Sequence, residues 1–332
     1  MSRFHLVNML AAVILCVCVL AGCSGGYVPG DDDSRLHIVC TTFPQYDWAA
    51  NLIRGNEKNV SLTLLMDKGG DLHNFQPSAL DIARVSDCDL FIYVGGESDM
   101  WVDDTLAEAV NTDMHVINMM DVISDNLVAE EDLEGFWHNE HDGNGHEEHD
   151  HEAEYDEHVW LSLRNAQLIV QNISEELAAM DNDNADLYRK NCDDYLLQLK
   201  ALDEQYIETV KESRCDTLLF ADRFPFRYLA EDYGIKCYAA FDGCSAEAEA
   251  SFGTVAFLAN KMDELGLGSV IIIDGSDDRL AQVVIENTRE KNQQIFVLNS
   301  LQSVSQKDMK AGLGYLSAME ENLRVLKQAL NG

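Results

Sequence analysis

Residues 89–96 read DLFIYVGG, an apolar run that stops at two glycines. A continuous apolar run that ends at turn residues is typical of a buried parallel strand followed by its turn. Similar runs precede and follow it, and stretches with a helical pattern separate them. The predicted strands are 36–42, 60–65, 89–94 and 114–118, and the predicted helices are 44–53 and one that begins at Ser78. This alternation favours a parallel sheet with helices on both faces.

The same alternation returns in the last third of the chain. The predicted strands there are 217–220, 236–241, 270–274 and 294–298, and the predicted helices are 225–233, 252–265, 280–291 and 307–330. Between the two regions, apolar residues recur at helical spacing over 164–180 and 184–213. We therefore predict an α/β fold of two similar lobes, 35–161 and 214–332, each a parallel sheet with flanking helices. Connecting helices occupy 162–213, and a length of 332 residues fits two domains or one large one.

The first 34 residues are expected to lie outside this fold. A signal peptide is predicted over 1–22, because the uncharged apolar run 9–20 is too short to span a bilayer comfortably. The run ends in LAGC at 20–23, which resembles the bacterial lipobox, where the cysteine is lipidated and the preceding peptide is removed. We predict that lipidated Cys23 anchors the chain outside a membrane through a flexible tether, 23–34. An ordinary secretory signal with a chance cysteine is the alternative.

The chain is strongly acidic, with 23 Lys and Arg against 59 Asp and Glu and a formal charge of −36. Such a charge repels a phosphate backbone, which argues strongly against nucleic acid as a partner. It attracts cations, metal ions included.

Six cysteines remain beyond the signal peptide and Cys23, at positions 40, 88, 192, 215, 237 and 244. None has the CxxC spacing of a zinc ribbon or a thioredoxin site. Cys237 and Cys244 are the closest pair, and an exported protein could form a disulfide there. Buried free thiols are the alternative.

Residues that follow the strands are the candidates for binding, because open α/β sheets bind ligands outside the carboxyl ends of their strands. In a protein of two lobes, these ends face the cleft between the lobes. The candidates are His73, the region of His158, Asp222 with Arg223, Glu247, Asp274 and Asn299. Imidazole is the commonest metal ligand, although a lone loop histidine is more often an ordinary surface residue.

An acidic, histidine-rich segment interrupts the alternation at 130–157. It contains 13 Asp and Glu and no Lys or Arg, and it cannot bury a core, so we predict a loop. Its histidines are His138, His141, His146, His149 and His151, and His158 follows directly. This composition indicates an auxiliary collector of Zn²⁺, and a solvated polar loop is the alternative.

Three motifs, taken together, resemble the metal-binding lipoproteins of ABC transporters for zinc and manganese. They are GDLHNFQPSALD at 70–81, FIYVGG at 91–96 followed by Trp101, and DEHVWLSL at 156–163. Zinc members of that family carry a His-rich acidic loop before the third motif, as this chain does. The resemblance implies that His73 and His158 are metal ligands, and that a long rigid helix joins the two lobes.

The chain departs from the family pattern at the two ligand positions of the second lobe. Arg223 stands where the family has His or Glu, and Asn299 stands where it usually has Asp. A guanidinium stays protonated and cannot bind a cation. Asp222 is therefore the predicted replacement ligand, with Asp274 and Glu247 in reserve. A structural ion pair between Asp222 and Arg223 is the alternative.

The resemblance implies an extracytoplasmic, lipid-anchored receptor that captures Zn²⁺, with Mn²⁺ less favoured, in the cleft. It would be a monomer and no enzyme, and would deliver the ion to an ABC permease served by an ATPase subunit. A metal-dependent surface adhesin on the same fold is one alternative. A zinc hydrolase using His149-Asp150-His151 is another, although no HExxH motif occurs.

Overall fold

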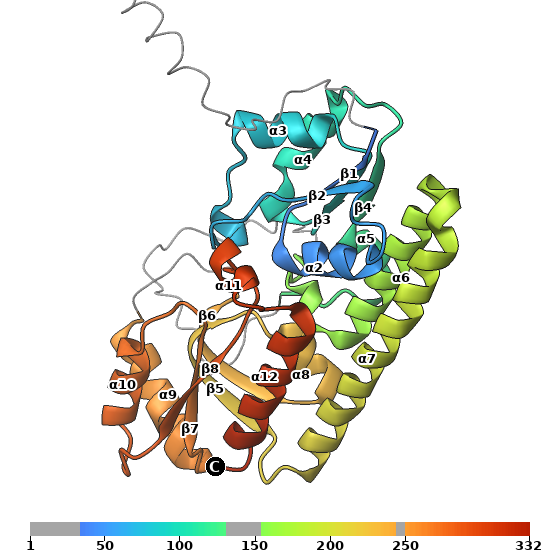
Figure 1. The fold of residues 1–332 in the computed structure, drawn as a ribbon. Coiled ribbons are helices and arrows are strands. Elements are labelled where there is room, and N and C mark those ends of the chain that lie inside the picture. Colours follow the sequence, from blue (N-terminus) through green and yellow to red (C-terminus); the bar gives the residue numbers. More distant parts are fainter. Residues whose placement is uncertain (1–33, 131–153, 244–249) are drawn as a thin grey trace, which may run out of the picture. The chain divides into compact units, whose positions relative to one another are not determined.

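Two four-stranded parallel sheets form the framework of the computed structural model, which describes residues 34–130, 154–243 and 250–332 (Figure 1). The first sheet contains β1 (Leu36–Cys40), β2 (Val60–Leu64), β3 (Leu90–Tyr93) and β4 (His115–Asn118), in the order β2-β1-β3-β4. The second contains β5 (Thr217–Phe224), β6 (Lys236–Asp242), β7 (Ser269–Ile273) and β8 (Gln294–Leu298), in the order β6-β5-β7-β8. The two sheets share one topology, so the prediction of two similar α/β lobes is confirmed.

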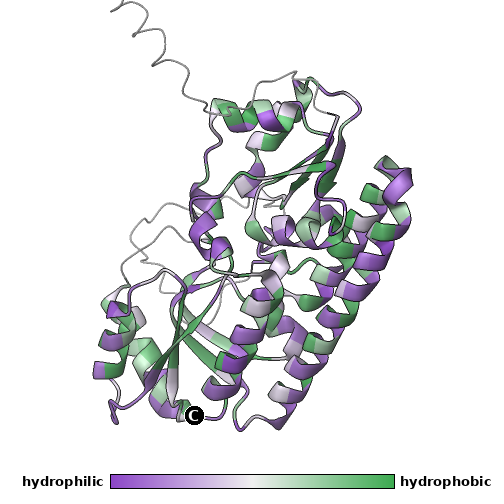
Figure 2. Cartoon of the chain, viewed as in Figure 1, coloured by the Kyte–Doolittle hydropathy of each residue, from purple (hydrophilic) through white to green (hydrophobic). Residues whose placement is uncertain are grey.

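Helices cover both sheets, as the strand–helix alternation requires. The first sheet carries α2 (Phe43–Leu52), α3 (Ala79–Ser86), α4 (Trp101–Ala107) and α5 (Met119–Val122). The second carries α8 (Arg227–Tyr233), α9 (Phe252–Leu265), α10 (Arg279–Glu286) and α12 (Tyr315–Ala329), whereas Gln306 of the short helix α11 (Gln306–Lys310) bonds to Asp67 of the first lobe. Figure 2 shows the strands mainly in the colours of hydrophobic residues, and β7, with the sequence SVIII, is buried at every position.

Two long helices connect the lobes, α6 (Leu163–Met180) and α7 (Ala185–Glu212). At 28 residues, α7 is about 42 Å long. Asn191 near its start donates hydrogen bonds to the carbonyls of Leu52 and Arg54, and Tyr206 near its end donates one to the carbonyl of Met319. The same helix is therefore fixed to both lobes, as the resemblance implied.

Two predicted helices at the C-terminal end differ from the structure. The helix expected over 307–330 is divided into α11 and α12 by residues 311–314, which include Gly312 and Gly314, because glycine is a poor helix former. The helix expected over 280–291 ends at Glu286.

The segment before α6 is buried against the second lobe. Trp160 is fully buried, and its indole N–H donates to the carbonyl of Ser300 at 2.9 Å. The hydroxyl of Tyr315 donates in turn to the carbonyl of Trp160 at 2.6 Å. These contacts fix the position of His158, two residues before Trp160.

Five cysteines lie within the described residues, at 40, 88, 192, 215 and 237, and all five are free thiols. Cys244 lies outside the described residues. In the three described ranges, no helix combines the length and the apolar character needed to cross a membrane.

Candidate metal centre

His73 lies in a short 3-10 turn, Leu72–Asn74, that follows β2. Asp71 begins this turn, and its Oδ1 accepts a 3.1 Å hydrogen bond from the backbone N–H of His73. The aspartate therefore fixes the turn that carries the imidazole, whose side chain is only 12% exposed.

His158 is held by the same local arrangement. Asp156, two residues earlier, accepts a 2.8 Å hydrogen bond from the backbone N–H of His158 and lies 3.0 Å from its ring Nδ1. The His158 side chain is fully buried. Both histidines are thus the last residue of an Asp-x-His sequence whose aspartate binds the histidine backbone.

The two imidazoles face each other through their Nε2 atoms, which are 3.3 Å apart. Zinc binds imidazole nitrogen at about 2.0–2.1 Å in tetrahedral geometry, which places two such nitrogens about 3.3–3.4 Å apart. The separation therefore matches that of two ligands of one zinc ion.

Hydrogen bonds at the opposite ring nitrogens leave both Nε2 atoms available. Ser98 Oγ donates to Glu157 Oε2 at 2.5 Å, so its oxygen can accept from Nδ1–H of His73 at 2.9 Å. Nδ1–H of His158 donates to the carboxylate of Asp156. With the proton on Nδ1 in each ring, both Nε2 atoms present lone pairs, as metal-binding histidines do.

The protonation of His73 suits metal binding. Burial lowers its pKa to about 4, and the charges of His158 and Arg223 act in the same direction, against Asp71 and Asp156. His73 is therefore a neutral imidazole at pH 7, which is the form that binds metals.

Glu157 approaches Ser98 because Gly96 leaves room for it. Gly96 has a φ of +79°, and a Cβ on it would lie 2.4 Å from Oε1 of Glu157. The backbone N–H of Ser98 donates to the same oxygen at 2.8 Å. Gly96, the second of the two glycines that follow β3, thus makes room for the contact between Glu157 and Ser98 that orients His73.

Two arginines of the second lobe lie beside the candidate centre. Arg223 in β5 donates from Nη1 to Oδ2 of Asp71 at 2.6 Å. Nε of Arg227 at the start of α8 lies 3.7 Å from Oδ2 of Asp156, and both of these side chains are buried. Each arginine therefore faces the aspartate that holds one of the two histidines.

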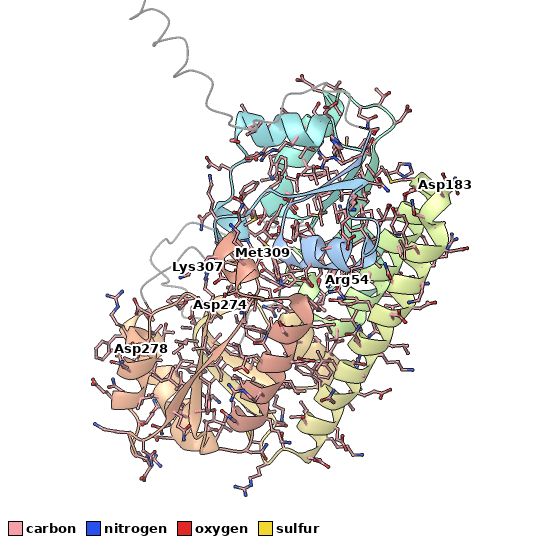
Figure 3. The ribbon with its side chains drawn as sticks, in the orientation of Figure 1. Arg54, Asp183, Asp274, Asp278, Lys307 and Met309 are labelled. Atoms are coloured by element: carbon pink, nitrogen blue, oxygen red, sulfur yellow. The ribbon has the colours of Figure 1, made fainter. Side chains whose placement is uncertain are left out.

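The predicted carboxylate ligands of the second lobe accept hydrogen bonds from other groups, Asp222 at both of its oxygens and Asp274 at Oδ1. Asp222 accepts from the backbone N–H groups of Arg223 and Ile273, and the side chain of Arg223 pairs with Asp71, not with Asp222. Asp274, which Figure 3 labels at the end of β7, accepts from the backbone and hydroxyl of Ser300.

Burial raises the pKa of Asp274, although the hydrogen bonds from Ser300 oppose it. Asn299 accepts from the backbone N–H of Leu301. Glu247 lies outside the described residues, as do the tract histidines. Within residues 34–130, 154–243 and 250–332, no group of three His, Cys, Asp or Glu side chains is arranged to hold a metal, so Asp222 and Asp274 as ligands stay predictions.

The backbone that follows β6 lies directly against His158. A Cβ on Gly243 would be 3.1 Å from Cε1 of His158 and 2.9 Å from the carbonyl oxygen of Phe224. The second lobe therefore covers one edge of this imidazole with main chain.

An acidic pocket of about 260 Å³ lies beside His73. It is lined by His73, Glu97, Ser98, Met100, Glu130, Glu154, Tyr155 and Glu157. Glu130 and Glu154 flank residues 131–153, and the backbone N–H of Glu130 donates to the carbonyl of Glu154 at 2.8 Å. Glu130 and Glu154, the described residues on either side of the tract, thus lie beside His73.

Two similar lobes with facing imidazoles define a bilobal α/β protein with a candidate metal site. The family model described as "ZnuA: Zinc-uptake complex component A periplasmic" matches residues 38–329. The chain therefore belongs to the ZnuA family.

Named relatives and solved structures agree with this membership. The zinc-binding lipoprotein AdcA of Streptococcus pneumoniae serotype 4 is 32% identical over 316 residues, which cover 95% of this chain and 59% of AdcA. The high-affinity zinc uptake system protein ZnuA of Bacillus subtilis is 29% identical, with 97% of both chains covered. The Zn(II)-bound ZnuA-like domain of S. pneumoniae AdcA has a TM-score of 0.70 and 26% identity, covering 90% of this chain and all of that one. The chain spans about 59% of the length of the AdcA relatives.

Proposed function

We propose that this protein is the zinc receptor of an ABC importer and that it captures Zn²⁺ between His73 and His158. The observation that carries this proposal is the 3.3 Å separation of the two Nε2 atoms, in rings that are each held at Nδ1 by another group. Membership of the ZnuA family supports the choice of zinc as cargo. The receptor makes and breaks no covalent bond.

The remaining zinc ligands are proposed to come from the second lobe. Asp222 is the first candidate, with Asp274 and Glu247 in reserve. Zinc with two neutral imidazoles keeps its full +2 charge, and a carboxylate would reduce it. To act as a ligand, Asp222 would exchange its hydrogen bond with Ile273 for the metal.

The tract histidines 138, 141, 146, 149 and 151 are proposed to collect zinc for the central site. Support comes from their composition and from Glu130 and Glu154, which lie in the same pocket as His73. An ion that passes Glu130 or Glu154 would lie in the pocket that His73 lines.

The receptor is proposed to work as a monomer outside the cytoplasmic membrane, anchored by lipid on Cys23. A permease and its ATPase subunit would be its partners. AdcA of S. pneumoniae is named a lipoprotein, which supports the anchor, and the LAGC sequence at 20–23 is its signal in this chain. The hydrolase alternative depended on His149-Asp150-His151, which lie outside the described residues.

A metal competition titration tests the function. The chain from residue 24 onward would be titrated with Zn²⁺ against a chromophoric chelator, with and without excess Mn²⁺. Imidazole ligands favour zinc over manganese, so one tight zinc site that resists Mn²⁺ is expected. Absence of tight zinc binding, or displacement of zinc by Mn²⁺, would reject the proposal.

A further inference from the structure

Within the described residues, the second lobe brings the positive charge of Arg223 to the turn that carries His73. Nη1 of Arg223 lies 2.6 Å from Oδ2 of Asp71. The two side chains are 23% and 14% exposed, so water and salt screen this pair less than they screen a surface pair.

Asp71 belongs to the turn that carries His73. Its other oxygen, Oδ1, holds the backbone N–H of His73. A carboxylate in this position attracts a cation at the histidine pair, and carboxylate oxygen is itself a zinc ligand. Arg223 occupies the oxygen of Asp71 that the His73 backbone does not use.

We propose that Arg223 neutralises Asp71 and thereby lowers the zinc affinity of the His73–His158 site, so that the second lobe sets how tightly the ion is held. This inference depends on the proposed zinc-binding function and adds a residue that determines affinity. Asp71 with Arg223 carries no net charge, whereas Asp71 alone would place one negative charge beside a divalent ion. Because a guanidinium stays protonated at every working pH, the neutralisation is permanent while the two side chains are in contact.

The test is a double-mutant cycle measured by chelator competition with Zn²⁺ at low ionic strength. Arg223→Gln should bind zinc about tenfold more tightly than the wild type, and Asp71→Asn about tenfold more weakly. The double variant should return to near the wild-type affinity. Arg223→Lys retains the charge and should stay within about threefold of the wild type.

Arg289→Gln is the matched control, because Arg289 forms an ion pair with Asp263 in the same lobe and is 82% exposed. It should leave zinc affinity unchanged. Circular dichroism would confirm that each variant is folded.

The outcomes separate this inference from the proposed function. If folded Arg223→Gln binds zinc no more tightly than the wild type, the inference is wrong while the zinc site stands. If the double variant binds as tightly as Arg223→Gln, Asp71 has no part in the effect and the inference is likewise overturned. If the wild type itself binds no zinc, the proposed function fails and the inference fails with it.

Discussion

The hydroxyl oxygen of Ser98 lies 2.9 Å from Nδ1 of His73 and donates its proton to Glu157. This contact determines which nitrogen of His73 is free to bind a metal. It links β3, which precedes Ser98, to the turn after β2.

Removal of the Ser98 hydroxyl is expected to weaken zinc binding without unfolding the protein. Ser98→Ala leaves His73 free to rotate and to place its proton on Nε2, so affinity should fall about tenfold. Chelator competition measures the change. The control is Ser317→Ala on α12, which should bind zinc like the wild type. Equal affinities for the Ser98 and Ser317 variants would contradict this role.

The lowered pKa of His73 predicts a pH dependence of stability. In the unfolded chain the imidazole titrates near about 6.5, whereas in the folded protein burial lowers its pKa to about 4. Between these values the unfolded state takes up a proton that the folded state does not. Above about pH 6.5, His73 should therefore cause no change in the free energy of unfolding with pH. As the pH falls from about 6.5 toward about 4, it should lower the free energy of unfolding.

Urea denaturation of the zinc-free protein across this pH range provides the measurement. The free energy of unfolding of His73→Gln should decline less steeply with falling pH than that of the wild type, because the titrating group is gone. Equal slopes in the two proteins would show that His73 does not titrate in this way.

Among the carboxylates proposed to complete the zinc site, Asp222 is expected to matter most. Asp222→Ala should cost more zinc affinity than Asp274→Ala or Glu247→Ala, and Arg223→His should strengthen binding by supplying an imidazole in place of a guanidinium. The comparison requires folded variants, because Asp222 also accepts from the backbone of Ile273. If none of the three substitutions changes affinity, the second lobe contributes no carboxylate ligand.

Deletion of residues 140–153 should lower the number of zinc ions bound and leave one tight site. Sites in an acidic segment that must be ordered around the ion are expected to be weaker and more sensitive to salt. Isothermal titration at two salt concentrations would count both classes of site. If the tight site were lost on deletion of residues 140–153, the main site would lie in that segment.

The fold was largely predictable from the sequence, because buried parallel strands are apolar along their whole length. The run at 89–94 became β3, and the strands of both lobes were found within a few residues of their observed ends. The division between α11 and α12 was missed because the apolar pattern continues across residues 311–314.

The candidate site was predictable only in part. His73 and His158 follow from motif position, and the fold brings their rings together. Ser98 and Glu157 gave no comparable signal, because their role depends on a contact 59 positions apart in the sequence. The Asp-x-His spacing at 71–73 and 156–158 was a local clue to the residues that hold the histidines, although the same spacing also occurs at 113–115.

The pairing of Arg223 could not be read from the sequence. Asp222 is its neighbour in the chain, yet the carboxylate of Asp222 accepts from the backbone N–H groups of Arg223 and Ile273. The partner is Asp71, 152 positions away. Only the packing of the second lobe against the turn after β2 brings these two groups into contact.

The zinc affinity of variants at the two histidines shows whether His73 and His158 form the zinc site. His73→Ala and His158→Ala should each bind zinc at least about a hundredfold more weakly than the wild type, since each removes one of about four zinc bonds. His115→Ala is the control, because His115 lies in the same lobe and binds Glu176 instead. If His73→Ala and His158→Ala remain folded and keep the wild-type affinity in chelator competition, the pair is not the zinc site and the account is wrong.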